Sequence, residues 1–169
     1  MKIEKVLDID NKIYINPKKI DKTSVHVSPT PYKYKTIIVD GDWDIKQDKF
    51  VDRSSFFNSF YDVEIFKKKK WEETSYLDKN GEKFLKRKKR IKSLVKIFND
   101  IKNNGWKEIG GYITINIGRN GEILFNDGQH RLTFALSLNL DKIPVKIFMV
   151  HKDFYKGNNL NEYINKNNI

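Results

Sequence analysis

Cysteine is absent from this sequence of 169 residues, and histidine is scarce. The lack of cysteine excludes disulfide bonds, catalytic thiolates and zinc sites built on cysteine ligands. The three histidines, His26, His130 and His151, are too few and too scattered to suggest a metal site made of histidine alone. Thiol chemistry and cysteine-type metal binding are therefore excluded as functions of this sequence.

Long apolar runs are absent as well. No stretch approaches the roughly 18–20 apolar residues that cross a bilayer, and the opening Met1–Glu4 does not resemble a secretory signal. We therefore expect a soluble, cytoplasmic protein with no membrane partner. The length predicts one domain, and 38% hydrophobic and 13% aromatic residues are enough to build one core. Nothing in the sequence indicates an oligomeric state.

Acidic residues are few relative to basic ones. There are 33 Lys and Arg against 22 Asp and Glu, and the segment Lys67–Lys102 alone holds 14 basic and 5 acidic residues. Such a segment favours polyanionic partners, because cations neutralise phosphates and release their counterions. Two clusters give the candidate DNA- or RNA-binding residues, which are Lys67, Lys68, Lys69, Lys70, Lys86, Arg87, Lys88, Lys89 and Arg90.

The excess of basic residues also has an interpretation that involves no binding partner. Most of the basic residues are lysines, and the whole chain is rich in Lys, Asn and Ile. Lysine runs also serve to keep the exposed face of a helix in water. Composition therefore leaves two alternatives open, a nucleic-acid-binding surface and a solvated face.

The hydrophobic pattern predicts several strands. Alternating or β-branched apolar residues indicate strands, and Asn120-Gly121 between two of them predicts a hairpin. The segment 2–8 fits either a strand or the start of a short helix. The predicted strands are 12–16, 34–39, 113–117, 123–125 and 143–150.

Apolar residues at helical spacing predict three helices. The first begins after Asp52 or Ser54, either of which would cap it. The second covers about 82–104 and ends at Gly105, and the third opens at Gly128 and ends near Asn139. The sequence therefore predicts a single α/β (α+β) domain, a small mixed sheet with flanking helices.

The segment Asp127–Arg131 is the strongest candidate site, because it joins a predicted strand to a predicted helix. A helix N-terminus offers free N–H groups and the positive end of the dipole, and Gly128 lets an anion approach the backbone. Asp127 is either a catalytic acid/base or simply a helix cap. The candidate phosphate ligands are Gly128, Gln129, His130 and Arg131, and the candidate catalytic residues are Asp127 and His130.

Around this segment the chain resembles the ParB/sulfiredoxin superfamily. The resemblance rests on Ile101–Gly105, the hairpin 113–126, Gly128–Arg131 and Ile143-Pro144-Val145, with Lys12–Ile20 similar to the family's opening strand. Asp127–Arg131 also spells the signature of DGQHR-type proteins. The resemblance implies a ParB/sulfiredoxin-like domain that binds a nucleoside triphosphate, ATP or CTP, with Gly128–Arg131 against the phosphates.

Individual positions refine the activity that the resemblance implies. Gln129 stands where sulfiredoxins carry their reactive cysteine, so sulfinic acid reduction is excluded. Asp127 matches an aspartate that free-serine kinases use in phosphoryl transfer. The expected activity is that of a Mg²⁺-dependent nucleotide hydrolase or phosphotransferase. A nuclease, and a nucleic-acid-binding accessory protein without catalysis, are the alternatives.

The segment of about 32–90 has no counterpart in the minimal family. We expect it to form a helical insertion in a domain of residues 1–155, followed by a polar tail, 156–169. Within the insertion, Asp42 and Asp44 are candidate ligands for Mg²⁺ on a bound triphosphate, because that ion needs only one or two carboxylates. The alternative is a tight acidic turn without a metal.

Overall fold

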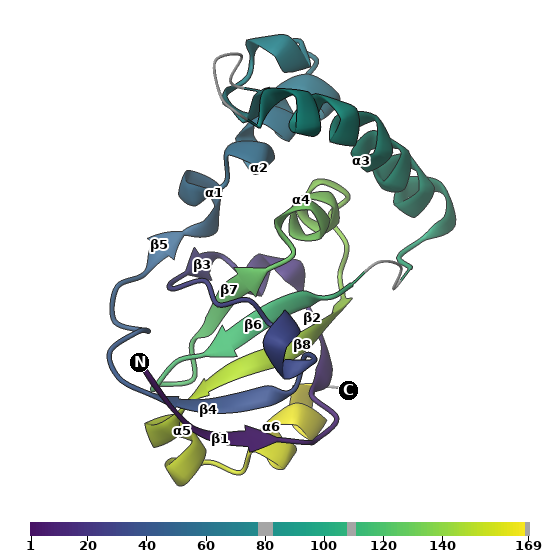
Figure 1. Cartoon of the computed structure of the whole chain (residues 1–169). Helices are drawn as coiled ribbons and strands as arrows, with labels where there is room; N and C mark the ends of the chain where they lie inside the picture. Colours follow the sequence, from purple (N-terminus) through teal and green to yellow (C-terminus); the bar gives the residue numbers. More distant parts are fainter. Residues whose placement is uncertain (78–82, 108–110, 168–169) are drawn as a thin grey trace.

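The computed structural model describes residues 1–77, 83–107 and 111–167, which form one mixed sheet with helices around it (Figure 1). The α/β class is therefore confirmed. The eight strands follow the order β1-β4-β8-β6-β7-β3-β5, with β2 paired to β8. They are β1 (Lys2–Leu7), β2 (Lys12–Ile15), β3 (Lys22–Thr23), β4 (Thr36–Asp40), β5 (Asp48–Lys49), β6 (Ile113–Ile117), β7 (Ile123–Asp127) and β8 (Ile143–His151).

Strand β8 is the centre of the sheet. It runs parallel to β4 and β6 and antiparallel to β2, and every residue of it except Lys146 is buried. A continuous apolar run suits a strand covered on both faces. Accordingly, its side chains divide between two buried clusters, with Ile147 and Val150 in one and Phe148 and Met149 in the other.

The three predicted helices begin and end close to the residues that the sequence indicates. Ser54, not Asp52, caps α2, since its Oγ accepts a hydrogen bond from the Phe57 N–H at 3.1 Å. Helix α3 ends at Gly105, which has a φ of +79°. The helices are α1 (Phe50–Arg53), α2 (Ser55–Phe60), α3 (Phe84–Asn104), α4 (Gln129–Ser137), α5 (Lys152–Gly157) and α6 (Leu160–Asn167), with a π-helical turn at Tyr61–Ile65.

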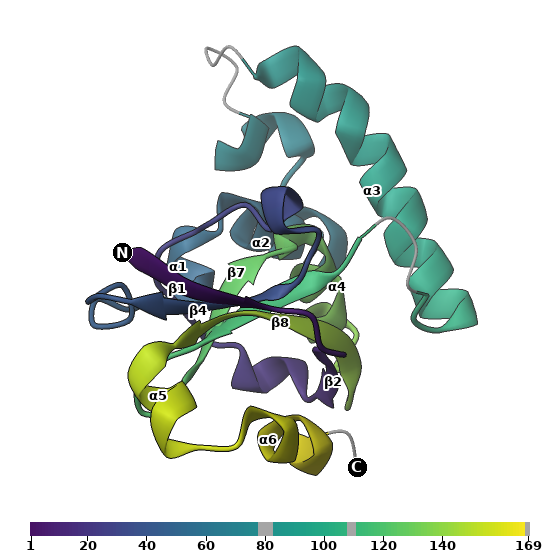
Figure 2. The same cartoon turned by 60° about the horizontal axis from the view of Figure 1, so that its bottom comes forward.

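Helices α2 and α3 form a separate layer above α4 (Figure 1 and Figure 2). Aromatic side chains fill the space between them, and Phe134 of α4 lies within 6.1 Å of the rings of Phe56, Phe60 and Phe98. The other side of α4 contributes Leu132 and Ala135 to the core of the sheet. Helix α4 therefore lies between the two layers.

The segment of 32–90 does not form one helical insertion. Its first part, Thr36–Asp40, is strand β4, which lies between β1 and β8 with its apolar residues fully buried. The helical part begins only at Phe50 and continues through α3. The run Ile37-Ile38-Val39 is β-branched and apolar, and such a run is most stable inside a sheet.

The residues expected to form a polar tail contribute to the core. Helix α6 buries Leu160 and Ile164, which are spaced four residues apart and lie on one face of the helix. In both views α5 and α6 lie at the end of the molecule away from α3 (Figure 1 and Figure 2). Within the described residues, no helix is both long and apolar enough to cross a membrane.

Candidate functional site

The turn between β7 and α4 holds the candidate motif. Gly128 is the N-cap of α4 and has a φ of +97°. A Cβ at this position would lie 2.9 Å from Ile113 Cα and 3.1 Å from the Tyr112 carbonyl oxygen. Glycine is therefore required here by both backbone conformation and space. The expected strand-to-helix junction is present.

A cavity of about 430 Å³ opens at this turn. Its walls come from the motif, from α3 and from two segments that precede β4 and β6. All five motif residues line the cavity, so the structure brings the candidate phosphate ligands and catalytic residues to one place. The lining residues are Tyr34, Arg90, Leu94, Ile97, Gly111, Tyr112, Asp127, Gly128, Gln129, His130, Arg131 and Phe134.

Arg131 lies half-buried in this cavity. Its Nη1 donates a hydrogen bond to the Gly111 carbonyl oxygen, and in the described part of the chain no carboxylate pairs with it. Burial lowers the pKa of Arg131, but a guanidinium stays charged at neutral pH. Arg90 lines the same cavity, and among the described residues Asp127 is the only acidic one in the lining. The lining therefore carries more positive than negative charge.

His130 also lines the cavity but packs mainly against the helical layer. Its ring meets the Phe56 ring edge to face at 4.4 Å, and its Nε2 lies 3.3 Å from the Tyr76 hydroxyl. Burial, with a smaller contribution from the charge of Arg90, lowers the pKa of His130 to about 4. At neutral pH the imidazole is therefore uncharged, and it would contact a phosphate only as a hydrogen-bonding group.

Asp127 and Gln129 differ in how they are held. Asp127 is exposed, and its Oδ1 accepts a hydrogen bond from the Gly128 N–H at 2.7 Å; the cap of α4 is Gly128 itself. Gln129 accepts a hydrogen bond from the Ser54 hydroxyl at 3.3 Å, which ties the motif to the start of α2. The Gln129 side chain thus already has a partner, whereas the Asp127 carboxylate faces solvent.

Two tyrosines that sequence analysis did not single out complete the cavity. Tyr34 and Tyr112 meet edge to face with their ring centroids 5.9 Å apart, and Lys146 Nζ lies 4.2 Å from the Tyr112 centroid. Lys33 and Tyr34 have φ values of +50° and +59°. No local pattern predicts such a conformation in these residue types, so the sequence held no signal for the position of Tyr34.

The structure places Asp42 and Asp44 far from the motif along the hairpin. They contact Arg119 in the turn after β6, whereas Asp127 pairs with Thr114 at the opposite end of the hairpin. The expected role of these aspartates, holding Mg²⁺ on a triphosphate at the motif, is therefore not supported. Within the described residues, no group of three or more His, Asp and Glu side chains is arranged to hold a metal.

The two aspartates instead anchor the loop after β4. Arg119 Nη2 lies 2.8 Å from Asp44 Oδ1 and 3.0 Å from Asp42 Oδ1, and the Arg119 N–H donates to Asp44 Oδ2 at 2.6 Å. Burial alone would raise the pKa of Asp44, but the hydrogen bonds from Arg119 outweigh it and the pKa lies below its usual value. The alternative of an acidic turn without a metal fits this arrangement.

The two basic clusters have different surroundings. Lys67 and Lys69 form ion pairs with Glu64 and Asp62, at 3.3 Å and 2.7 Å, so part of the first cluster is neutralised locally. In the second cluster, Arg87 lies 5.0 Å from the Tyr76 ring centroid, and Lys88 lies 3.7 Å from Glu72. Arg90 alone among these nine residues reaches the cavity.

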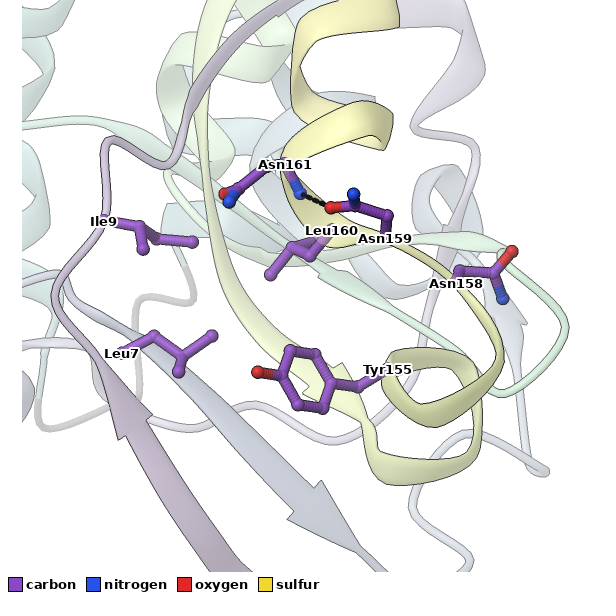
Figure 3. Close-up of a pocket in the computed structure, with 7 residues that line it drawn as sticks. All are labelled: Leu7, Ile9, Tyr155, Asn158, Asn159, Leu160 and Asn161. Atoms are coloured by element: carbon purple, nitrogen blue, oxygen red, sulfur yellow. Dashed lines mark hydrogen bonds between the residues drawn. The ribbon is translucent and has the colours of Figure 1, made fainter.

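A second cavity, of about 320 Å³, lies between the segment after β1 and the start of α6 (Figure 3). Its polar side chains are those of Tyr155 and three asparagines, and local hydrogen bonds hold two of the asparagines. Asn159 Oδ1 accepts hydrogen bonds from the N–H groups of Asn161 and Glu162, and Asn158 donates to the Phe154 carbonyl oxygen. No charged side chain of the described residues lines this cavity, so it offers no comparable site.

Comparisons of the chain with protein-family models, curated proteins and solved structures give no match. The resemblance to the ParB/sulfiredoxin superfamily therefore stays an expectation drawn from the sequence.

Proposed function

We propose that the cavity at Asp127–Arg131 binds the phosphate groups of a nucleoside triphosphate, ATP or CTP. The observation that carries this proposal is the half-buried guanidinium of Arg131, which has only a neutral carbonyl acceptor among the described residues. A charge held partly out of water without a counterion is costly. A bound anion would remove that cost, and a phosphate matches the fork of a guanidinium.

The rest of the cavity suits a nucleotide. The first-turn N–H groups of α4 have no acceptor within the helix and are available to phosphate oxygens. Arg90, from α3, also lines the cavity, and Tyr34 and Tyr112 add aromatic surface for a base or a sugar. The cavity volume of about 430 Å³ lies within the range of small-molecule sites.

Hydrolysis or transfer of a phosphate would depend on Asp127. In the part of the chain that the structure describes, this exposed residue is the one carboxylate that lines the cavity, and Mg²⁺ needs only one or two carboxylates beside the phosphates. Asp127 would hold Mg²⁺ or act as the acid/base, and Arg131 would stabilise the charge that develops in the transition state. His130, which is uncharged at neutral pH, would contribute a hydrogen bond to the substrate.

Replacing Arg131 tests the phosphate role directly. We expect Arg131→Ala to weaken ATP or CTP binding at least about tenfold, because hydrogen bonds to charged groups contribute about 1.5–3 kcal/mol. Calorimetric titration of the folded variant measures the loss. Arg53→Ala is the matched control, since Arg53 is exposed and pairs with Asp48 outside the cavity.

A thermal-shift screen of nucleoside triphosphates, with and without Mg²⁺, selects the ligand for that titration. Arg131→Lys separates charge from geometry, because lysine keeps the charge but loses the bidentate fork. Equal affinity of wild type and Arg131→Ala would refute the phosphate role. A screen in which no triphosphate stabilises the wild-type protein would refute nucleotide binding as a whole.

A further inference from the structure

A line of cations leads out of the cavity along α3. Lys83, Lys86 and Arg90 are spaced by three and four residues, so they lie on one flank of the helix. All three are exposed, and none has an acidic partner among the described residues. Arg90 lines the cavity, Lys86 lies one turn before it, and Lys83 is the N-cap. We call these three residues the α3 stripe.

The α3 stripe extends beyond the reach of a single bound nucleotide. Lys83 and Lys86 are not among the residues that line the cavity. Lys83 lies about 10 Å from Arg90 along the helix axis, at 1.5 Å per residue. A nucleotide held at Arg131 would leave these two lysines uncovered. Exposed cations that follow a line suit a chain of phosphates, whose counterions they displace.

The cavity at the end of the α3 stripe offers aromatic rings as well as charge. Tyr34 and Tyr112 lie in contact there, and the Lys146 ammonium lies over the Tyr112 ring. Sites for single-stranded nucleic acids combine these two features, a positive groove for the backbone and aromatic rings for the bases. The bases of a duplex could not stack on these tyrosine rings, because their faces are already stacked on one another inside the helix.

We propose that the nucleotide at Arg131 is one unit of a single-stranded nucleic acid whose further phosphates run along Lys83, Lys86 and Arg90. This inference rests on the proposed function, because the same cavity holds the nucleotide unit. It joins the motif to Lys86 and Arg90 of the second basic cluster in one surface. Lys92 and Lys96 lie two and six residues after Arg90, on the other flank of α3, and take no part in it.

The two flanks of α3 supply a matched pair of variants for the test. Lys83→Gln/Lys86→Gln and Lys92→Gln/Lys96→Gln each remove two charges from the same helix. Fluorescence anisotropy measures binding of a labelled oligothymidylate of about 12 nucleotides, within the usual site size. An oligouridylate and a duplex of the same length are measured in parallel, and calorimetry gives the ATP or CTP affinity of each protein.

We expect the wild-type protein to bind the single strands more tightly than the duplex and to release them when ATP or CTP is added. Lys83→Gln/Lys86→Gln should weaken strand binding roughly tenfold and lower the slope of log affinity against log salt by about 1.4. Its triphosphate affinity should stay unchanged. Lys92→Gln/Lys96→Gln should change strand affinity by less than about twofold. The two oligonucleotides show whether DNA or RNA is preferred.

Other results overturn the inference and can be told apart from failure of the proposed function. If the triphosphate binds but strands do not compete with it, the inference is wrong and the proposed function stands. If both double variants lost the same amount of single-strand affinity, the binding would be non-specific attraction to charge. If the duplex bound as tightly as the single strands, contacts between the bases and the tyrosine rings would be excluded. Strand binding unaffected by Arg131→Ala, together with no triphosphate binding, would contradict both proposals.

Discussion

His130 shows how one environment sets the chemistry of a residue. The ring lies against Phe56 and Tyr76, and the charges of Arg90 and Arg87 are close to the same contact. A positive charge on His130 would be desolvated there and repelled by the charge of Arg90. The neutral ring instead fills the space between the motif and the helical layer. The packing that gives His130 its structural role therefore also lowers the pKa of its imidazole.

This low pKa predicts a loss of stability in acid. The folded-state pKa of about 4 lies below the usual 6.5, so the unfolded chain binds more protons between these pH values. The contribution of the neutral imidazole to the free energy of unfolding is complete above about pH 6.5 and is lost as the pH falls through about 4. It amounts to at most about 3 kcal/mol. Urea unfolding of wild type and His130→Gln at pH 7 and pH 4.5 measures it.

Aspartates also titrate in acid, but they do so in both proteins. The difference between the stability changes of wild type and His130→Gln therefore reports the titration of His130 alone. We expect the wild type to lose more stability than His130→Gln over this pH range. His26→Gln, at an exposed position, is the control and should behave as the wild type does. Parallel pH profiles for wild type and His130→Gln would show that the imidazole is not held neutral by the fold.

At the scale of elements, the turn between β7 and α4 decides whether the cavity forms. Gly128→Ala would force a Cβ against Ile113 and place alanine at a φ of +97°. We expect it to lower the free energy of unfolding by about 1–3 kcal/mol, the cost of such a strained conformation. Triphosphate affinity should fall as well, because the first-turn N–H groups shift. Chemical denaturation and calorimetry measure the two effects.

Gly157→Ala is the matched control for this turn, since a Cβ there meets nothing within 4 Å and its φ lies outside the left-handed region. We expect this variant to change neither the stability nor the affinity by a measurable amount. If Gly128→Ala were as stable as Gly157→Ala, the close approach of the turn to β6 would not be a constraint on the fold.

Local patterns were sufficient to predict the elements that carry the motif. The hairpin of β6 and β7, the helix α4 and the strand β8 each follow from residues within the element and its ends. Gly128, which cannot be replaced without strain, lies inside the predicted turn itself. The candidate phosphate ligands were found for the same reason, because they are consecutive in the chain.

Contacts between distant segments could not be predicted in this way. Asp44 and Arg119 are separated by 75 positions, so nothing in the acidic turn indicates that an arginine already occupies it. The same holds for Tyr34 and Arg90, which reach the cavity from different elements. The spacing of Lys83, Lys86 and Arg90 at helical intervals indicates from sequence alone that they share one flank of α3. It does not indicate that this flank leads to the cavity.

At the scale of the whole molecule, the sheet and the helical layer share one helix. Trp106 and Leu140 pack against both main hydrophobic clusters, and α4 places Phe134 in one and Leu132 in the other. Neither layer buries its apolar surface without α4. The cavity depends on this arrangement, because Arg90 belongs to the helical layer and Arg131 to α4. Unfolding of either layer would therefore also destroy the site.

This shared core predicts a single cooperative unfolding transition. Trp43, in the loop after β4, packs against the sheet, and Trp71 packs against the helical layer, so variants that retain only one of these two tryptophans report each layer separately. We expect coincident urea midpoints for both tryptophans and for far-ultraviolet circular dichroism. Phe134→Ala should cost about 3–5 kcal/mol and separate the midpoints, whereas Phe66→Ala, at an exposed position, should not. Separate midpoints in the protein without the Phe134 substitution would mean that the two layers fold independently and that the cavity joins two units.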